Sequence, residues 1–90
     1  MMYYLLSFSS THDGIATKMH LRNKFNFTIL PTPREIHASC GISIRIRGED
    51  FDSILALLAS LKLNSDRVQI HRIITDNEKN VYEPIQKAPT

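Results

Sequence analysis

The feature that most constrains the fold of this chain is the strictly alternating run ISIRIR at residues 42–47. Because successive side chains of a β-strand point to opposite faces of a sheet, the isoleucines share one face and the polar side chains share the other. The run therefore predicts a half-buried strand, and it is the clearest strand in the chain.

The next pattern along the chain is helical. Apolar residues recur at the spacing of an amphipathic helix, at Phe51, Ile54, Leu55, Leu58 and Leu61. The segment Gly48-Glu49-Asp50 precedes them, and Asp50 or one of its neighbours can cap the helix. This helix is the most secure element that the sequence predicts.

Another helix is predicted nearer the N-terminus, at residues 12–23, with Ser10 or Thr11 as its N-cap. Asn23 can supply a left-handed exit from it. The inward-facing stripe of this helix is expected to be Ile15, Ala16 and Met19.

Further apolar segments are predicted to be strands, at residues 3–8, 25–30 and 68–75. A polar turn at residues 76–80 then leads to the segment 81–85. Three alternatives stay open for this C-terminal segment: an extra strand, a docking arm or a disordered tail.

The resulting order β-α-β-β-α-β predicts an α+β protein, a ferredoxin-like sandwich with two helices on one face of an antiparallel sheet. Ninety residues are enough for one domain. We expect residues 1–76 to form that domain and residues 77–90 to be a C-terminal extension. In this topology the first and third strands are neighbours, and the first strand-to-helix loop shares an edge with the loop at residues 31–41.

The composition argues against two classes of binding partner, nucleic acid and membrane, and indicates where in the cell the protein is expected. A net charge of +2 with scattered basic residues argues against nucleic-acid binding. The apolar start lacks the features of a signal peptide, and no run approaches membrane-spanning length, so no membrane association is expected. One cysteine cannot form an internal disulfide, and the expected location is the cytoplasm.

The single cysteine, Cys40, is the main candidate for chemistry. Ser39 and Gly41 flank it, and Arg34 and His37 lie within six residues of it. Nearby cations and free backbone amides favour the reactive thiolate form of cysteine. The predicted topology also brings Cys40 to the N-terminus of the first helix, where free amides and the helix dipole stabilise an anion. Two further residues are placed there, Thr11 and His12.

Other interpretations of the same residues stay open. A lone cysteine is often a buried structural residue. His12, His37 and Cys40 could instead hold a metal, although the paired cysteine spacings of zinc sites are absent. Arg34 and His37 could also be ordinary surface side chains. No role is assigned to His20 and His71, or to the arginines expected on the solvated face of the sheet, Arg45, Arg47 and Arg72.

Four short segments together resemble the selenium/sulfur carrier protein-like family: residues 4–8, 10–12, 29–36 and 39–42. The resemblance covers about residues 3–68. It implies that Cys40 carries sulfur or selenium as a persulfide or perselenide, between donor and acceptor proteins such as a cysteine desulfurase. It also implies that helix amides, Arg34 and Ser39 hold the anion, that no cofactor is needed, and that the protein is a carrier more than a stand-alone enzyme.

A second hypothesis belongs to a different class of function. The chain could be a small-molecule-sensing or protein-interaction module in which Cys40 is structural and the loop at residues 31–41 forms a binding lip. Cys40→Ser would leave such a module intact, whereas it would abolish a carrier. In either case an exposed edge at the second or fourth strand could pair with a second copy of the chain.

Overall fold

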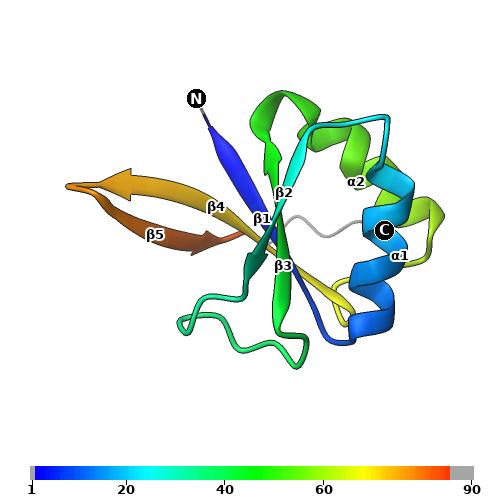
Figure 1. Cartoon of the computed structure of the whole chain (residues 1–90), viewed down its shortest axis with the longest axis horizontal. Coiled ribbons are helices and arrows are strands. Elements are labelled where there is room, and N and C mark those ends of the chain that lie inside the picture. The colour runs from blue at the N-terminus through cyan, green and yellow to red at the C-terminus, as the bar shows by residue number, and fades with distance from the viewer. Residues whose placement is uncertain (1, 86–90) are drawn as a thin grey trace.

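Five antiparallel strands form one sheet in the computed structural model, which describes residues 2–85 (Figure 1). The order across the sheet is β2-β3-β1-β4-β5. Two helices, α1 and α2, complete the α+β architecture that the sequence predicts, and the fifth strand goes beyond that prediction. The bounds are β1 Tyr3–Phe8, α1 Thr11–Leu21, β2 Phe27–Pro31, β3 Ile42–Arg47, a 3-10 turn Gly48–Asp50, α2 Phe51–Ser60, β4 Val68–Asp76 and β5 Lys79–Pro84.

Strand β1 lies in the middle of the sheet and sets which side chains share a face. It pairs with β3 and with β4, so the predicted contact between the first and third strands is confirmed. Leu6 is opposite Ile44, while its neighbour Ser7 is opposite Ser43. The alternation in β3 therefore separates isoleucines from polar residues as predicted.

The face that carries Leu6, here called the helix face, packs against the helices. Its strand residues are apolar and nearly all fully buried: Leu6, Phe8, Ile44, Ile46, Val68 and Ile70. Helix α2 contributes Ile54, Leu55 and Leu58 to the same core, as its periodicity predicts. Phe51, at the start of α2, stacks on the Tyr4 ring with the centroids 4.0 Å apart. The side chain of Asp50 makes no capping hydrogen bond.

Helix α1 differs from its prediction in the residues that it buries and in the residue at which it ends. The expected inward stripe is wrong, because Ile15 is 44% and Met19 63% exposed, and Ala16 is only half-buried. The buried side of α1 consists instead of Asp13, Gly14, Thr17 and Leu21. The helix also ends at Leu21 rather than Asn23, although Asn23 does adopt the predicted left-handed backbone with φ 65°.

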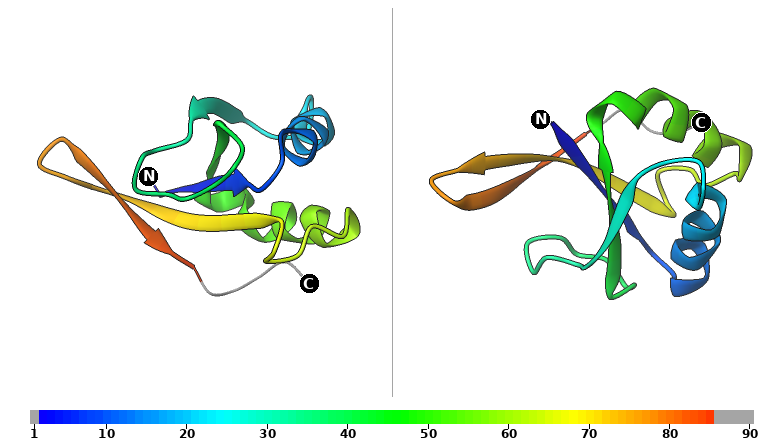
Figure 2. Two further views of the ribbon diagram at one scale, coloured as in Figure 1. Left: turned by 90° about the horizontal axis from the view of Figure 1, so that it is seen from below. Right: turned by 45° about the horizontal axis from the view of Figure 1, so that its top comes forward.

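The C-terminal part of the described chain is a hairpin. Asn77 and Glu78 both have positive φ, a backbone that suits the tight turn between β4 and β5. This hairpin projects past the rest of the sheet (Figure 2). Of the three alternatives for residues 81–85, the structure has the extra strand, while residues 86–90 of the predicted extension lie outside the described residues.

The extra strand also changes which strands are edges. The expectation of an exposed edge at the fourth strand is wrong, because β5 pairs with β4 from Asp76 to His71. The two edges of the sheet are β2 and β5. An unpaired edge at the second strand agrees with the prediction.

Candidate functional site

Cys40 lies at the junction of the β2–β3 loop with β3, and its backbone ties that loop to the centre of the sheet. Its N–H donates to the Phe8 carbonyl at 3.2 Å, and its own carbonyl accepts from the Thr32 hydroxyl at 3.0 Å. The residue is 1% exposed and belongs to the apolar core cluster. The loop and the β1–α1 connection therefore meet at one edge, as the predicted topology requires.

The Cys40 sulfur packs against the first turn of α1. A Cβ atom added to Gly14 would lie 3.7 Å from Cys40 Sγ and 3.3 Å from Phe8 Cδ2. Glycine thus allows the helix to approach both side chains closely. This approach is also one reason why Gly14, rather than Ile15, faces the sheet. The predicted juxtaposition of Cys40 with the start of the first helix is present.

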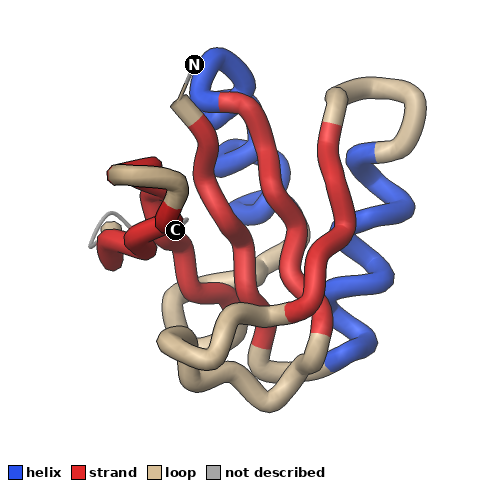
Figure 3. The backbone as a smooth tube through the Cα atoms, turned by 60° about the vertical axis from the view of Figure 1, so that its left-hand side comes forward, coloured by secondary structure: helices blue, strands red, loops and turns tan. Residues whose placement is uncertain are grey.

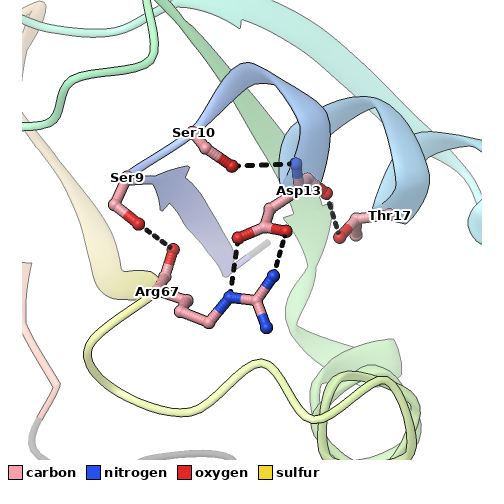
Figure 4. Close-up of polar contacts among 5 residues, drawn as sticks. All are labelled: Ser9, Ser10, Asp13, Thr17 and Arg67. Carbon is pink, nitrogen blue, oxygen red and sulfur yellow. Dashed lines mark hydrogen bonds and ion pairs between the residues drawn. The ribbon is translucent and has the colours of Figure 1, made fainter.

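The start of α1 carries a buried charge that has its own partner. The Asp13 carboxylate receives two hydrogen bonds from the Arg67 guanidinium, at 2.9 and 2.6 Å (Figure 4). Ser10 is the N-cap, and its hydroxyl accepts from the Asp13 N–H at 3.2 Å. Thr17 donates to the Asp13 carbonyl, and Ser9 donates to the Arg67 carbonyl. The Asp13 carboxylate, although paired with Arg67, lies at the helix N-terminus and therefore already interacts with the positive end of the helix dipole.

The opposite side of the sheet, here called the loop face, is crossed by the β2–β3 loop (Figure 3). A chain of hydroxyls joins loop and sheet: Ser7 and Ser43 are 2.9 Å apart, and Thr32 is 2.8 Å from Ser43. Both serines are fully buried. The same Thr32 hydroxyl bonds the Cys40 carbonyl, so the loop-face hydroxyls and the cysteine backbone form one connected network.

The middle of the loop is held to β4. Gln69 donates from its side-chain amide to the His37 carbonyl at 2.7 Å. Ile36 is 6% exposed, although it is not part of the core on the helix face. The Ile36 N–H donates to the Pro33 carbonyl at 3.0 Å, which closes a single hydrogen-bonded turn within the loop. One apolar side chain and a few hydrogen bonds thus anchor the loop.

The remaining predicted site residues are exposed and lie in the first turn of α1 and on the β2–β3 loop. No side chain of this group makes a hydrogen bond to the sulfur among residues 2–85. A hollow of about 410 Å³ lies on the loop directly before Cys40, lined by Ile36, His37, Ala38 and Ser39. The exposed residues of the group are Thr11, His12, Arg34, His37, Ser39 and Gly41.

Residues 2–85 contain no group of three or more histidine, cysteine, aspartate or glutamate side chains placed to hold a metal ion. None of their helices has the length and apolar character needed to cross a membrane.

His71 is a buried histidine on β4. It is 8% exposed, lies opposite Leu5 on the loop face, and has no hydrogen-bond partner for Nδ1 in the described structure. Burial lowers the pKa of its imidazole below the ordinary value of 6.5. Sequence analysis assigns no role to this residue, because its neighbours lie on adjacent strands and are not evident from the sequence of β4.

Several residues that shape the site escaped sequence reasoning. Gly14 had a usable signal, since glycine inside a helix often marks a close approach. The partner of Asp13 had none, because Arg67 is 54 residues away in the chain. Ser7 and Ser43 are polar residues in strands, and only the strand register shows that they meet.

Comparison with known proteins identifies the family. A family model described as "Putative Se/S carrier protein-like" matches residues 3–74, which is most of the chain and includes all of the junction around Cys40. Searches of curated proteins and of solved structures find no match. On the extent of this match, the chain belongs to the Se/S carrier protein-like family.

Proposed function

We propose that this protein carries sulfur or selenium on Cys40 between a donor protein and an acceptor protein. The observation that carries the proposal is the packing of Cys40 Sγ against the first turn of α1, at Gly14, in a chain of this family. At this helix start the Asp13 N–H bonds Ser10 Oγ and the Gly14 N–H bonds the Ser10 carbonyl, so support for an adjacent anion comes from the helix dipole and from the N–H groups of Thr11 and His12. A thiolate or persulfide anion is the form that such a carrier uses.

The transfer step conserves atoms and electrons. The Cys40 thiolate attacks the outer sulfur of a donor cysteine persulfide, a new S–S bond forms on Cys40, and the donor leaves as a thiolate. An acceptor thiolate then attacks the outer sulfur on Cys40 in the same way. The sulfur moves between thiols without a net oxidant or reductant, and a perselenide would follow the same course. A single cysteine is sufficient, and no cofactor is required.

Transfer requires the buried sulfur to become accessible. The end of the β2–β3 loop carries Cys40 between two exposed residues, Ser39 and Gly41. It is held by the hydrogen bonds of Cys40 to Phe8 and Thr32. We infer that the β2–β3 loop moves when a donor or acceptor binds, since no attacking thiolate can reach a sulfur in a closed core.

The exposed residues around the junction have proposed roles once the loop has moved. Arg34 and His37 supply positive charge or a proton donor to the sulfur anion, as sequence reasoning suggests. Ser39 and Thr11 supply hydroxyl donors, Gly41 leaves room for the partner, and His12 lies at the helix start.

The proposed carrier function has consequences for the fold class, the location and the partners of the protein. We propose that the fold belongs to the ferredoxin-like class, with residues 1–76 as the carrier domain and residues 77–90 as the extension; the α+β sheet with β5 at one edge supports this proposal. The proposed location is the cytoplasm, with a cysteine desulfurase as one class of donor. An unpaired edge strand could join two copies of the chain.

The direct test is intact mass spectrometry after incubation with a pyridoxal-phosphate cysteine desulfurase and cysteine or selenocysteine. We expect one added sulfur or selenium on the wild type and none on Cys40→Ala. A carrier that the same desulfurase is known to charge serves as the positive control. If that control is charged while folded wild-type protein gains no mass, the carrier function fails for this class of donor.

One observation favours a second candidate function. Cys40 is 1% exposed and packs in the apolar core, which is the environment of a structural cysteine. The protein would then be a small-molecule-sensing or interaction module whose β2–β3 loop forms the binding surface. Under that function Cys40→Ser keeps partner binding, whereas under the carrier function the same variant accepts no sulfur.

A further inference from the structure

The loop face has a second region, which the β2–β3 loop does not cover. It is a hollow of about 240 Å³ beside the start of β1, lined by Tyr3, Asn26, Phe27, Thr28, Arg45 and Arg47. Tyr3 is opposite Arg47, and Arg45 is opposite Thr28, so strand register places these four side chains together on one face. The sequence alone assigned both arginines to solvent.

Arg45 is held in place without being neutralised. Its guanidinium carbon lies 4.7 Å from the centroid of the Tyr3 ring, and its Nη2 is 3.4 Å from the Thr28 hydroxyl. An aromatic face and a hydroxyl orient a guanidinium but leave its charge and most of its N–H donors free. Among residues 2–85, Arg45 makes no ion pair.

Arg47 adds a second positive charge, which Glu49 partly compensates. Its Nη1 is 3.1 Å from a Glu49 carboxylate oxygen, and both side chains are substantially exposed. Exposed ion pairs of this kind contribute little and can exchange partners. The residues that line the hollow include no carboxylate, so its local charge is positive.

We propose that this hollow binds the phosphoryl group of a small phosphate ester. Planar guanidinium groups bond phosphate oxygens in pairs, and Arg45 and Arg47 approach the hollow from neighbouring positions of one strand face. The Thr28 hydroxyl and the Asn26 amide add neutral donors for the remaining oxygens. The ring of Tyr3, on the same face as the two arginines, can contact the organic part of the ester.

The proposed site is separate from the junction around Cys40. Tyr3 and Phe8 are the two ends of β1, and five residue steps along a strand correspond to about 17 Å. Cys40 bonds the far end of β1, at Phe8, and its sulfur faces the helices rather than the loop face. Loss of phosphate binding would therefore leave sulfur loading of Cys40 unchanged, and the reverse holds as well.

The test is a titration followed by two-dimensional amide NMR in a phosphate-free buffer. The probe is phenyl phosphate, with phenol as the uncharged control and inorganic phosphate as the free-ion control. We expect saturable shifts at Tyr3, Thr28 and Arg45 with phenyl phosphate and none with phenol. If inorganic phosphate binds as tightly as phenyl phosphate, the phosphoryl site is supported, and the free phosphate ion is sufficient for binding.

Variants make the site assignment specific. Arg45→Gln should weaken phenyl phosphate binding about tenfold or more, because a charged hydrogen-bond donor is lost. Arg47→Gln should weaken binding less, since that guanidinium already has a partner. Arg22→Gln, an exposed arginine at the end of α1, is the matched control and should bind as the wild type does.

Three results would overturn the proposal. The first is the absence of saturable shifts at these residues, and the second is unchanged affinity in a folded Arg45→Gln protein. The third is far tighter binding of a single-stranded RNA oligonucleotide to the same residues, which would make the surface a nucleic-acid site instead. Amide spectra of each variant establish that it is folded before its affinity is compared.

Discussion

The two faces of the sheet are covered by different means, and the contrast bears directly on how Cys40 could work. On the helix face, α1 and α2 bury apolar strand residues such as Leu6 and Ile44 completely. On the loop face, the β2–β3 loop covers the buried Ser7 and Ser43, and hydrogen bonds from Thr32 and Gln69 hold it. The apolar side chains buried on this side are fewer, namely Leu5 and Ile36. Cys40 lies where the two coverings meet.

This difference predicts unequal resistance to opening. Apolar burial contributes about 25 cal/mol for each Å² removed from water, and the helix face removes many large side chains. A hydrogen bond contributes only about 0.5–1.5 kcal/mol net, because the released groups bond to water instead. The loop can therefore open at a smaller free-energy cost than the helix layer, and opening of the loop is what a buried carrier cysteine requires.

The largest effect should come from the helix face. Leu58→Ala removes a fully buried side chain of α2 and should lower the free energy of unfolding by about 2–5 kcal/mol. Met19→Ala, on the exposed side of α1, is the control and should change it by less than about 0.5 kcal/mol. Urea unfolding followed by circular dichroism measures both. Equal losses in the two variants would contradict the assignment of buried faces.

The next effect concerns the loop anchor. Ile36→Ala should cost about 2 kcal/mol, near the lower end for a buried aliphatic residue, because a loop can relax around the lost side chain. Under native conditions it should also speed reaction of Cys40 with a thiol reagent, since loop opening alone would expose the sulfur. Arg34→Ala, in the exposed turn of the same loop, is the control. Unchanged thiol reactivity in Ile36→Ala would show that the loop does not control access.

The contrast also explains what the sequence could predict. Hydrophobic periodicity identifies β3 and α2, since their buried faces are set by local spacing of apolar residues. It fails for α1, where Asp13 is buried because Arg67 neutralises it, and where Gly14 faces the sheet because it has no side chain. The covering of the loop face depends on pairs far apart in sequence, such as Gln69 with the His37 carbonyl. Periodicity carries no information on such pairs.

A smaller effect is expected from the hydroxyl network beneath the loop. Ser43→Ala removes the middle member, so the Ser7 and Thr32 hydroxyls each lose a partner, and the expected cost is about 1–2 kcal/mol. The Ser7→Ala/Ser43→Ala double variant should cost less than the sum of its single variants, because it leaves fewer buried hydroxyls unpaired. Urea midpoints provide the comparison. Additive costs would mean that the hydroxyls act independently and that the network does not hold the loop.

The smallest effect tests whether the loop face tolerates a charge. Burial lowers the pKa of His71 below 6.5, so below that pH the unfolded chain binds a proton that the folded protein excludes. Stability from this group is therefore fully present above pH 6.5 and falls as the pH is lowered toward the folded-state pKa. We expect the urea midpoint of the wild type to drop more between about pH 7.5 and 5.5 than that of His71→Gln. His20→Gln, an exposed histidine on α1, should keep the wild-type dependence. If His71→Gln follows the same pH profile as the wild type, the loop face accepts the imidazolium, which would mean that water enters beneath this covering far more readily than beneath the helices.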